Sequence, residues 1–256
     1  MITQFKLLIN HSTPSIELSS GWLSAYSKKH NFEVVRSLDS ISSQTGIFEF
    51  KDNKLILHLM LDGQVSNIYF DLNEGSLGYR AKNVNKTNEL IARAIGCKSN
   101  FRPNVLDATA GMGRDALIMS KLGCQVVMQE RCHAIFLLLE NALARLNHVQ
   151  PEIKKALSLE NINSISSFSN LKNIDVIYLD PMFPSRKKSA LVKKEMRLFK
   201  RLAGEDLDAD QLLQNALDSS VNRVVVKRPK TAPQLGELSP SHEITSKNFR
   251  FDVYLK

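Results

Sequence analysis

From about residue 103 onward, short apolar strands alternate with helical segments, and this alternation limits the possible folds more than any other feature. Buried strands joined by helices form parallel sheets that are covered on both faces, so the pattern predicts a doubly wound α/β domain. The expected strands are 105–107, 125–130, a short one near 157–159, 174–179 and 223–227, and a β-hairpin is expected at 244–255. The expected helices are 114–122, 133–147 and 209–217, with a further polar helix after the strand near 157–159.

The amino-terminal third has a different texture. The segments 46–51, 55–61 and 65–72 are rich in β-branched and aromatic residues, and the turn-forming pairs Asp52-Asn53 and Asp62-Gly63 separate them. This arrangement predicts an antiparallel meander. A helix is expected at 88–97. We therefore predict a small β-rich domain over 1–86 and the α/β domain over 87–256.

Composition excludes several classes of protein. With 43% hydrophobic and 23% charged residues the chain is typical of folded proteins, and it has no apolar run long enough to span a membrane. The three cysteines form no Cys-x-x-Cys motif, and the histidines are not clustered. We expect no disulfide framework, no metal site and a cytoplasmic location.

The positive charge is concentrated in one segment. The net charge is +8, and the stretch 186–201 holds eight basic residues and one acid, which is +7. A charge run is often only a solvated helix face, but a polyanionic partner such as RNA is the alternative. We expect basic residues of this segment, and two at the end of the strand 223–227, to bind phosphates. The candidates are Arg186, Lys187, Lys188, Lys193, Lys194 and Arg197 in the segment, and Lys227 and Arg228 at the strand end.

A glycine-bearing turn follows the first strand of the α/β domain. In the sequence DATAGMGRD (107–115), Gly111 and Gly113 allow a tight bend and a close approach of a ligand to the backbone. A dinucleotide is one candidate ligand, although Ala116 stands where the third glycine of that fingerprint belongs. Glu130 ends the second strand, where a carboxylate can accept both hydroxyls of a ribose. An acid at Asp107 disfavours a pyrophosphate but suits the sulfonium and ammonium groups of S-adenosylmethionine.

The strand 174–179 ends in Asp180-Pro-Met-Phe-Pro. The Asp180 carboxylate is suited to accept hydrogen bonds from an exocyclic amine on a planar base, and Phe183 offers a ring on which that base can stack. Asp-Pro pairs also simply initiate turns. We predict catalytic roles for Asp180 and Phe183.

Together these segments resemble the RsmJ family, bacterial methyltransferases of the guanine N2 amine in small-subunit ribosomal RNA. The resemblance runs in order from about residue 105 to 235. The motifs that carry it are DATAGMGRDA (107–116), LGC (122–124), ER (130–131), YLDPMFP (178–184), KSALVKKEMR (188–197) and VVVKRP (224–229).

The resemblance implies a class I methyltransferase fold with a seven-stranded Rossmann-like sheet, S-adenosylmethionine as cofactor and 16S ribosomal RNA of the small subunit as substrate. Two rival functions are an adenine-N6 or cytosine-N4 methyltransferase and a non-catalytic ribosome-assembly factor. The cofactor-binding residues expected from the turn and the resemblance together are Asp107, Gly111, Gly113, Arg114, Asp115, Glu130, Arg131, Ile162, Asn163 and Asp180.

Overall fold

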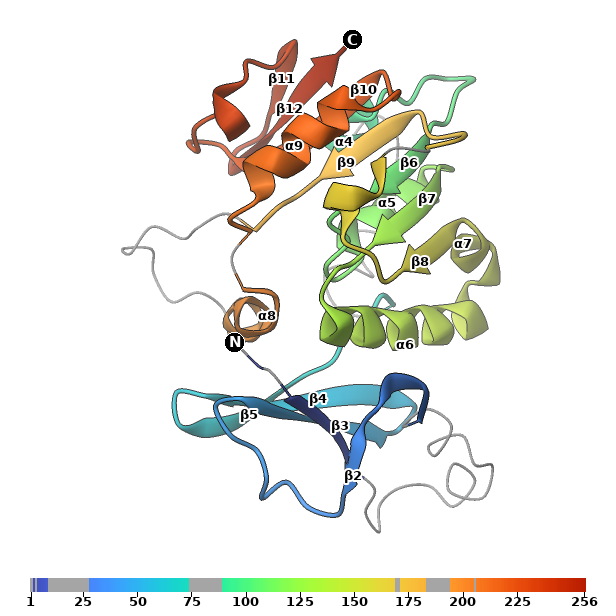
Figure 1. Ribbon diagram of the computed structural model, residues 1–256. Helices are drawn as coiled ribbons and strands as arrows, with labels where there is room; N and C mark the ends of the chain where they lie inside the picture. The colour runs from blue at the N-terminus through green and yellow to red at the C-terminus, as the bar shows by residue number, and fades with distance from the viewer. Residues whose placement is uncertain are drawn as a thin grey trace. The chain divides into compact units, whose positions relative to one another are not determined.

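The computed structural model describes residues 2, 4–8, 28–73, 89–168, 171–182, 194–204 and 206–256. They form two compact units (Figure 1). The first unit comprises residues 1–70 and 186–204, and the second comprises residues 71–185 and 205–256. The expected boundary at residue 86 lies outside the described residues. The units differ from the expected domains in two respects, because the second unit begins at residue 71 and because 186–204 belongs to the amino-terminal unit.

The amino-terminal unit contains a five-stranded sheet of order β2-β1-β3-β4-β5. The antiparallel pairing of β3 with β4 and of β4 with β5 confirms the predicted meander. Its two turns have positive φ at Asp52, Asn53, Asp62 and Gly63, as tight hairpins with a right-handed twist require. The sequence reasoning missed β1 and β2, which pair in parallel. The strands are Gln4–Leu8 (β1), Glu33–Val35 (β2), Thr45–Lys51 (β3), Lys54–Leu61 (β4) and Gln64–Ile68 (β5).

Helix α8 (Lys194–Ala203) belongs to this unit because its apolar side packs beside β5. Leu198 and Leu202 are buried, and the rings of Phe199 and Phe70 stack with centroids 6.3 Å apart. The basic segment of the sequence therefore contains an amphipathic helix that adds to the small sheet.

The second unit contains a seven-stranded sheet of order β11-β12-β10-β9-β6-β7-β8. Five of its strands are parallel, and β12 runs antiparallel to β10 as part of the predicted terminal hairpin. The carboxyl ends of the parallel strands consequently share one edge. The strands are Asn104–Asp107 (β6), Gln125–Gln129 (β7), Leu157–Glu160 (β8), Val176–Leu179 (β9), Arg223–Pro229 (β10), His242–Thr245 (β11) and Phe249–Leu255 (β12).

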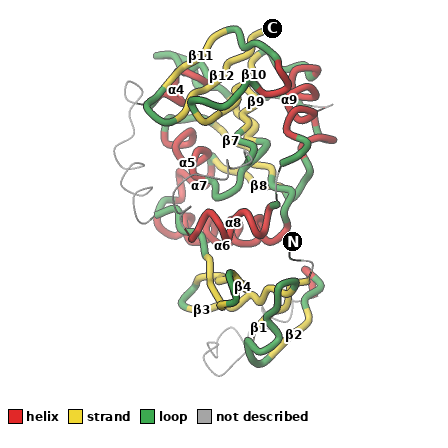
Figure 2. Tube along the Cα trace, turned by 90° about the vertical axis from the view of Figure 1, so that its left-hand side faces the viewer, coloured by secondary structure: helices red, strands yellow, loops and turns green. Residues whose placement is uncertain are grey.

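Helices cover both faces of this sheet. In Figures 1 and 2, α9 lies on one face, and α4 and α5 lie on the other. Beneath α9, Leu212, Leu213 and Ala216 join the buried residues of β9 and β10 in the main core. The helices are Leu90–Ala94 (α4), Arg114–Lys121 (α5), His133–Val149 (α6), Pro151–Lys155 (α7) and Ala209–Asp218 (α9), with a short 3-10 helix at Leu235–Glu237 (η3).

The prediction of a polar helix after β8 is wrong. Among the described residues of that segment, the structure has only a 3-10 helix, Ser164–Ser166 (η1). Polar side chains compete for the backbone in this segment, which is why a longer helix does not form. The Asn163 side chain accepts a hydrogen bond from the Ile165 N–H, and the Ser166 hydroxyl donates to the Asn163 backbone carbonyl.

Candidate active site

The glycine turn lies between β6 and α5, at the carboxyl edge of the large sheet. Gly111 and Gly113 both have positive φ, of 53° and 69°. A Cβ atom added at Gly113 would lie 2.7 Å from Leu139 Cδ1 of α6, so a side chain here would force Leu139 to move and would also be strained by the positive φ. The turn thus brings backbone and the positive amino-terminal end of α5 close to whatever binds at this edge.

Glu130 follows β7 and is 7% exposed. Its two carboxylate oxygens accept hydrogen bonds from the backbone N–H groups of Gly111 (3.0 Å) and Cys132 (2.7 Å). Burial raises the pKa of Glu130, and these two donors oppose that rise. Because each carboxylate oxygen has a second acceptor position, Glu130 can hold the glycine turn and still accept a ligand hydroxyl.

Asp107 ends β6 beneath the turn and is 2% exposed. Burial raises the pKa of its carboxyl to about 8. The Thr109 N–H opposes this rise, the nearby carboxylates of Asp115 and Asp180 add to it, and Lys227 lowers it. The ligand-free site therefore holds a proton on Asp107 at neutral pH, which a bound cation would displace.

This raised pKa predicts a pH-dependent stability. Between about pH 4 and pH 8 the folded protein retains the Asp107 proton and the unfolded chain does not, so stability falls as the pH rises through that window. Asp107→Asn removes the titration. In urea unfolding without cofactor, we expect the variant to gain stability relative to the wild type as the pH rises from about 5 to about 8. A pH-independent difference would contradict the assignment.

Asp180, directly after β9, belongs to a hydrogen-bonded cluster centred on Lys227 of β10. The Lys227 ammonium donates to Asp180 Oδ2 (2.8 Å) and to Asp115 Oδ2 (2.7 Å). Asp115 also accepts a hydrogen bond from the hydroxyl of Tyr178 (2.7 Å). Burial of Lys227 opposes its charge, but the two carboxylates outweigh burial and raise its pKa. Lys227 therefore stays an ammonium that orients both acids.

Two parts of this arrangement were not found by sequence reasoning. Lys227 had been assigned to phosphate binding, whereas the structure places its ammonium between two acids of the site. The hydroxyl of Thr109 accepts a hydrogen bond from the Asp180 backbone N–H (2.6 Å), which joins the glycine turn to the Asp-Pro segment. The signal for Lys227 was its place at the end of a strand that neighbours β9.

The remaining expected cofactor residues surround the same edge. Arg114 is exposed at the first position of α5. Arg131 pairs with Asp206 and Asp208. Ile162, 39% exposed, and Asn163 lie in the loop after β8, where Asn163 caps η1. The structure thus brings all of these residues to the ends of β6, β7, β8 and β9.

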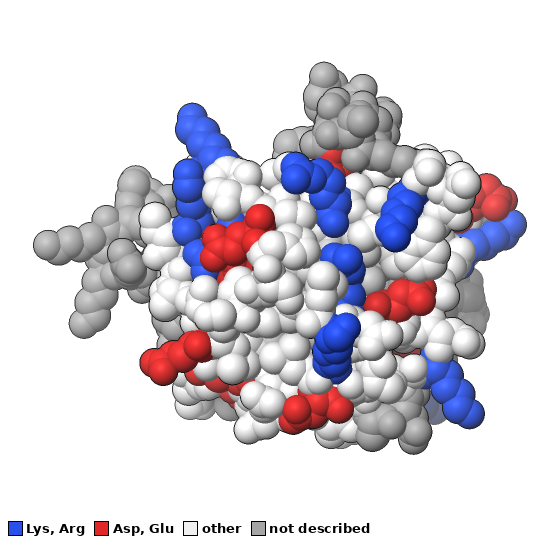
Figure 3. Space-filling model, turned by 90° about the horizontal axis from the view of Figure 1, so that it is seen from above, with Lys and Arg blue, Asp and Glu red and all other residues white. Residues whose placement is uncertain are grey.

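The predicted base-stacking residue, Phe183, lies outside the described residues, as do Arg186, Lys187, Lys188 and Lys193. In the amino-terminal unit, Lys194 is exposed at the start of α8, and Arg197 pairs with Asp62. Figure 3 shows the face on which the C-terminus lies, and there basic and acidic side chains are interspersed. That face offers no broad patch of one charge among the described residues.

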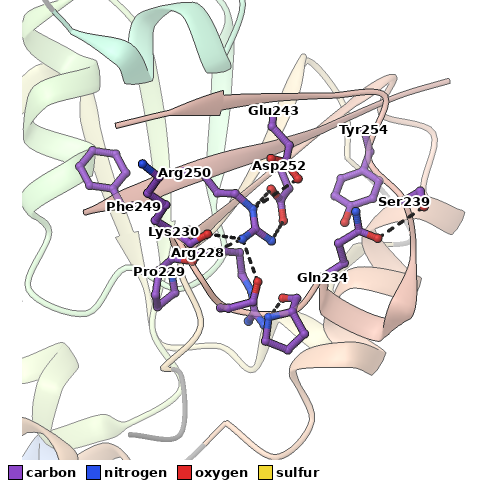
Figure 4. Close-up of polar contacts among 12 residues, drawn as sticks. Arg228, Pro229, Lys230, Gln234, Ser239, Glu243, Phe249, Arg250, Asp252 and Tyr254 are labelled. Atoms are coloured by element: carbon purple, nitrogen blue, oxygen red, sulfur yellow. Dashed lines mark hydrogen bonds and ion pairs between the residues drawn. The ribbon is translucent and has the colours of Figure 1, made fainter. Parts of the chain in front are cut away.

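Arg228 was also expected to bind RNA phosphate, but its side chain is buried, with 4% exposure, and does not face solvent. Its guanidinium donates to the Pro233 carbonyl (2.9 Å). Beside it, Arg250 pairs with Asp252 and donates to the carbonyls of Lys230 (2.9 Å) and Ala232 (2.8 Å), as Figure 4 shows. The two arginines together hold the backbone that follows β10.

The charges of the site select between the two cofactors that the glycine turn allows. Asp107, Asp115, Glu130 and Asp180 gather at one edge, and Lys227 is the cation hydrogen-bonded to two of them. An anionic pyrophosphate would be repelled by the Asp115 and Asp180 carboxylates, whereas a ligand with a sulfonium and an ammonium group would be attracted to them and would favour release of the Asp107 proton. The donor set therefore fits S-adenosylmethionine.

Within the described part of the chain, no helix is long and apolar enough to cross a membrane. The same residues contain no group of three or more His, Cys, Asp or Glu side chains placed to hold a metal ion.

Comparison with known proteins agrees with this chemistry. Residues 33–256 match the family model described as "Putative SAM-dependent methyltransferase". A protein of Colwellia psychrerythraea named ribosomal RNA small subunit methyltransferase J is 40% identical over 244 residues, covering 93% of this chain and 90% of that protein. One of the same name from Shewanella denitrificans is 38% identical and covers 98% of each.

Solved structures include a SAM-dependent methyltransferase from Neisseria gonorrhoeae, similar with a TM-score of 0.72 and 26% identity over 98% of this chain and 96% of that one. The strand order, the acidic edge and these matches agree on both fold and cofactor class. The chain belongs to the SAM-dependent methyltransferase family that this model describes, together with the two relatives above that are named ribosomal RNA small subunit methyltransferase J.

Proposed function

We propose that this protein transfers a methyl group from S-adenosylmethionine to the exocyclic N2 amine of a guanine in the 16S ribosomal RNA of the small subunit. The observation that carries the proposal is the Asp180 carboxylate, held by Lys227 at the same sheet edge as the glycine turn and Glu130. The names of the relatives support ribosomal RNA as the substrate. The resemblance supports the guanine N2 position.

Each residue at the carboxyl edge of the large sheet would contact a different part of the cofactor. Glu130 would accept the ribose hydroxyls, Asp107 and Asp115 would face the positive groups, and Arg114 with the amino end of α5 would attract the carboxylate. The adenine base of the cofactor would extend along the loops that contain Arg131, Ile162 and Asn163. When bound, S-adenosylmethionine supplies an electrophilic methyl carbon on a sulfonium.

Asp180 would act on the target amine. Its carboxylate would accept a hydrogen bond from the amine N–H, which would direct the nitrogen lone pair toward the methyl carbon. As the new N–C bond replaced the C–S bond of the sulfonium, the nitrogen would release a proton, which would pass to Asp180. Lys227 contacts one oxygen of Asp180 and fixes the plane of the carboxylate, so positioning supplies much of the acceleration. Phe183 would stack on the base.

RNA phosphates would be held by the basic segment. It begins a few residues after Asp180 and continues into α8, whose apolar side packs within the amino-terminal unit. Exposed Lys194, together with Lys193 and the cations at 186–188, would provide the electrostatic, sequence-independent part of binding.

The test of the function is methyl transfer from labelled S-adenosylmethionine to small subunits isolated from a strain that lacks the gene. After digestion of the ribosomal RNA, mass spectrometry is expected to identify N2-methylguanosine in the reacted sample and not in the mock reaction. N6-methyladenosine or N4-methylcytidine as the product would contradict the guanine assignment. Failure to transfer methyl to subunits, their assembly intermediates or naked RNA would favour the non-catalytic assembly factor.

A prediction for the cofactor site concerns Glu130. Glu130→Ala is expected to weaken S-adenosylmethionine binding by about 1–3 kcal/mol, because charge-assisted hydrogen bonds to the ribose are lost. Isothermal titration calorimetry measures the affinity. Glu160→Ala is the matched control, since Glu160 ends the neighbouring strand β8 and bonds to the Gln129 side chain. Equal affinity in the folded Glu130 variant and the control would remove Glu130 from the ribose site.

A further inference from the structure

A single carboxylate, that of Asp206, connects two loops of the candidate site. Its Oδ1 atom accepts a hydrogen bond from the Arg131 guanidinium, and its Oδ2 atom accepts one from the backbone N–H of Met182. The side chain is 18% exposed. Asp206 precedes α9, so it is not part of either loop that it contacts.

The two loops follow strands that are not neighbours. Arg131 comes directly after Glu130 at the end of β7, and Met182 lies two residues after Asp180 at the end of β9. Strand β6 separates β7 from β9 in the sheet, and strands are spaced about 4.8 Å apart. No ladder hydrogen bond can therefore join the two loops directly, and Asp206 spans the gap.

The contact with Met182 restrains the segment that carries Asp180. Residue 181 is proline and has no N–H, so the Met182 N–H is the first backbone donor after Asp180. Thr109 holds the segment at the Asp180 N–H, and Asp206 holds it at the Met182 N–H. Two anchors on either side of a proline leave the backbone at Asp180 little freedom.

A purely local role in starting α9 does not account for the Asp206 side chain. The residue at the amino-terminal cap of α9 is Asp208, and the first turn is closed by the backbone carbonyls of Asp206 and Asp208. Both Asp206 side-chain oxygens are instead directed to Arg131 and Met182.

We infer that Asp206 is a positioning residue, which ties the cofactor loop at Arg131 to the Asp180-Pro-Met182 segment and so holds the Asp180 carboxylate ready for the target amine. This inference rests on the proposed role of Asp180. It assigns to Asp206 an effect on turnover rather than on the affinity for either substrate, because the Met182 contact acts on the Asp180 segment, while Asp208 keeps Arg131 paired when Asp206 is changed.

Asp208 provides a matched control. Its carboxylate also pairs with Arg131 (2.7 Å) from the same short segment, but among the described residues its side chain has no hydrogen bond to Met182. Asp208→Ala therefore removes an acid and one Arg131 contact, whereas Asp206→Ala removes an acid, one Arg131 contact and the Met182 anchor. Asp206→Asn keeps the size of the side chain and replaces one acceptor by a donor.

The first measurement is amide hydrogen exchange at Met182, followed by NMR in protein labelled with ¹⁵N-methionine, where the seven methionines give few signals. Met182→Leu identifies the relevant signal. We expect exchange at Met182 to be at least tenfold faster in Asp206→Ala than in the wild type, faster to a smaller extent in Asp206→Asn, which keeps one acceptor, and unchanged within threefold in Asp208→Ala.

The second measurement is steady-state methyl transfer to small subunits. We expect kcat to fall about tenfold or more in both Asp206 variants, with KM for the subunit and Kd for S-adenosylmethionine within about threefold of the wild-type values. In Asp208→Ala, kcat is expected to stay within threefold. Thermal unfolding of each variant confirms that folded protein is compared.

The inference is overturned if Met182 exchanges at the wild-type rate in both Asp206 variants, or if their kcat falls no further than that of Asp208→Ala. It is also overturned if the loss appears only in the Kd for S-adenosylmethionine. A wild-type protein that methylates no ribosomal substrate contradicts the proposed function instead, and the exchange rates then still decide whether Asp206 anchors Met182.

Discussion

Asp180→Ala is expected to lower the rate of methyl transfer about 100-fold or more at saturating S-adenosylmethionine. The variant loses the acceptor that aligns the target amine, and positioning of this kind is worth at least that factor. It also leaves the Lys227 ammonium with Asp115 as its remaining carboxylate partner in the cluster. Single-turnover transfer to small subunits measures the effect, and saturation with cofactor separates it from any loss of binding.

Asp175→Ala is the control for this experiment. Asp175 immediately precedes the same strand, at the amino end, where its carboxylate accepts a hydrogen bond from the Asn104 N–H (2.8 Å). We expect its saturated rate to remain near that of the wild type. Near-wild-type turnover in Asp180→Ala would remove Asp180 from the reaction.

Arg250→Met is expected to lower the free energy of unfolding by about 3–5 kcal/mol, the cost of leaving a buried partner charge uncompensated. Asp252 is fully buried, and Arg250 contacts both of its oxygens, at 2.6 and 3.0 Å (Figure 4). The same guanidinium also donates hydrogen bonds to the carbonyls of Lys230 and Ala232 after β10, and these carbonyls lose their donor in the variant. Urea unfolding followed by circular dichroism measures the loss.

Two further variants test whether the loss in Arg250→Met comes from the buried ion pair. Lys247→Met removes an exposed cation in the same hairpin and is expected to change the free energy of unfolding by less than about 0.5 kcal/mol. Arg250→Met combined with Asp252→Leu is expected to recover part of the loss, because the Asp252 carboxylate is then no longer buried without its partner. An Arg250 variant as stable as the wild type would show that the pair contributes nothing to the fold.

Much of the α/β domain could be predicted because its signals are local. The apolar runs of β6, β7, β9 and β10 appear directly in the sequence, and Gly113 and Gly123 bound α5 on either side. The antiparallel meander followed from the turn pairs, since Asp62-Gly63 readily takes the positive φ of a tight hairpin. By contrast, β1 and β2 were missed because their parallel pairing depends on partners distant in the sequence.

In the candidate site, only the residues at strand ends and in the glycine turn could be predicted from the sequence. Asp107, Glu130 and Asp180 each follow an apolar strand, and parallel strands bring such residues to one edge. Neither Thr109 nor Asp206 has a sequence signal of this kind. Each acts by a side-chain hydrogen bond to the backbone of another loop.

The sequence by itself determined the class of sheet, the glycine turn, the acids that end the strands and the concentration of positive charge. Only the tertiary structure decided which partner each charge has. Lys227 and Arg228 are adjacent in a basic pair, yet successive residues of a strand point to opposite faces, so Lys227 reaches Asp180 while Arg228 is buried under the Pro233 loop. Charge pairing depends on contacts between elements far apart in the chain, and composition and periodicity carry no record of them.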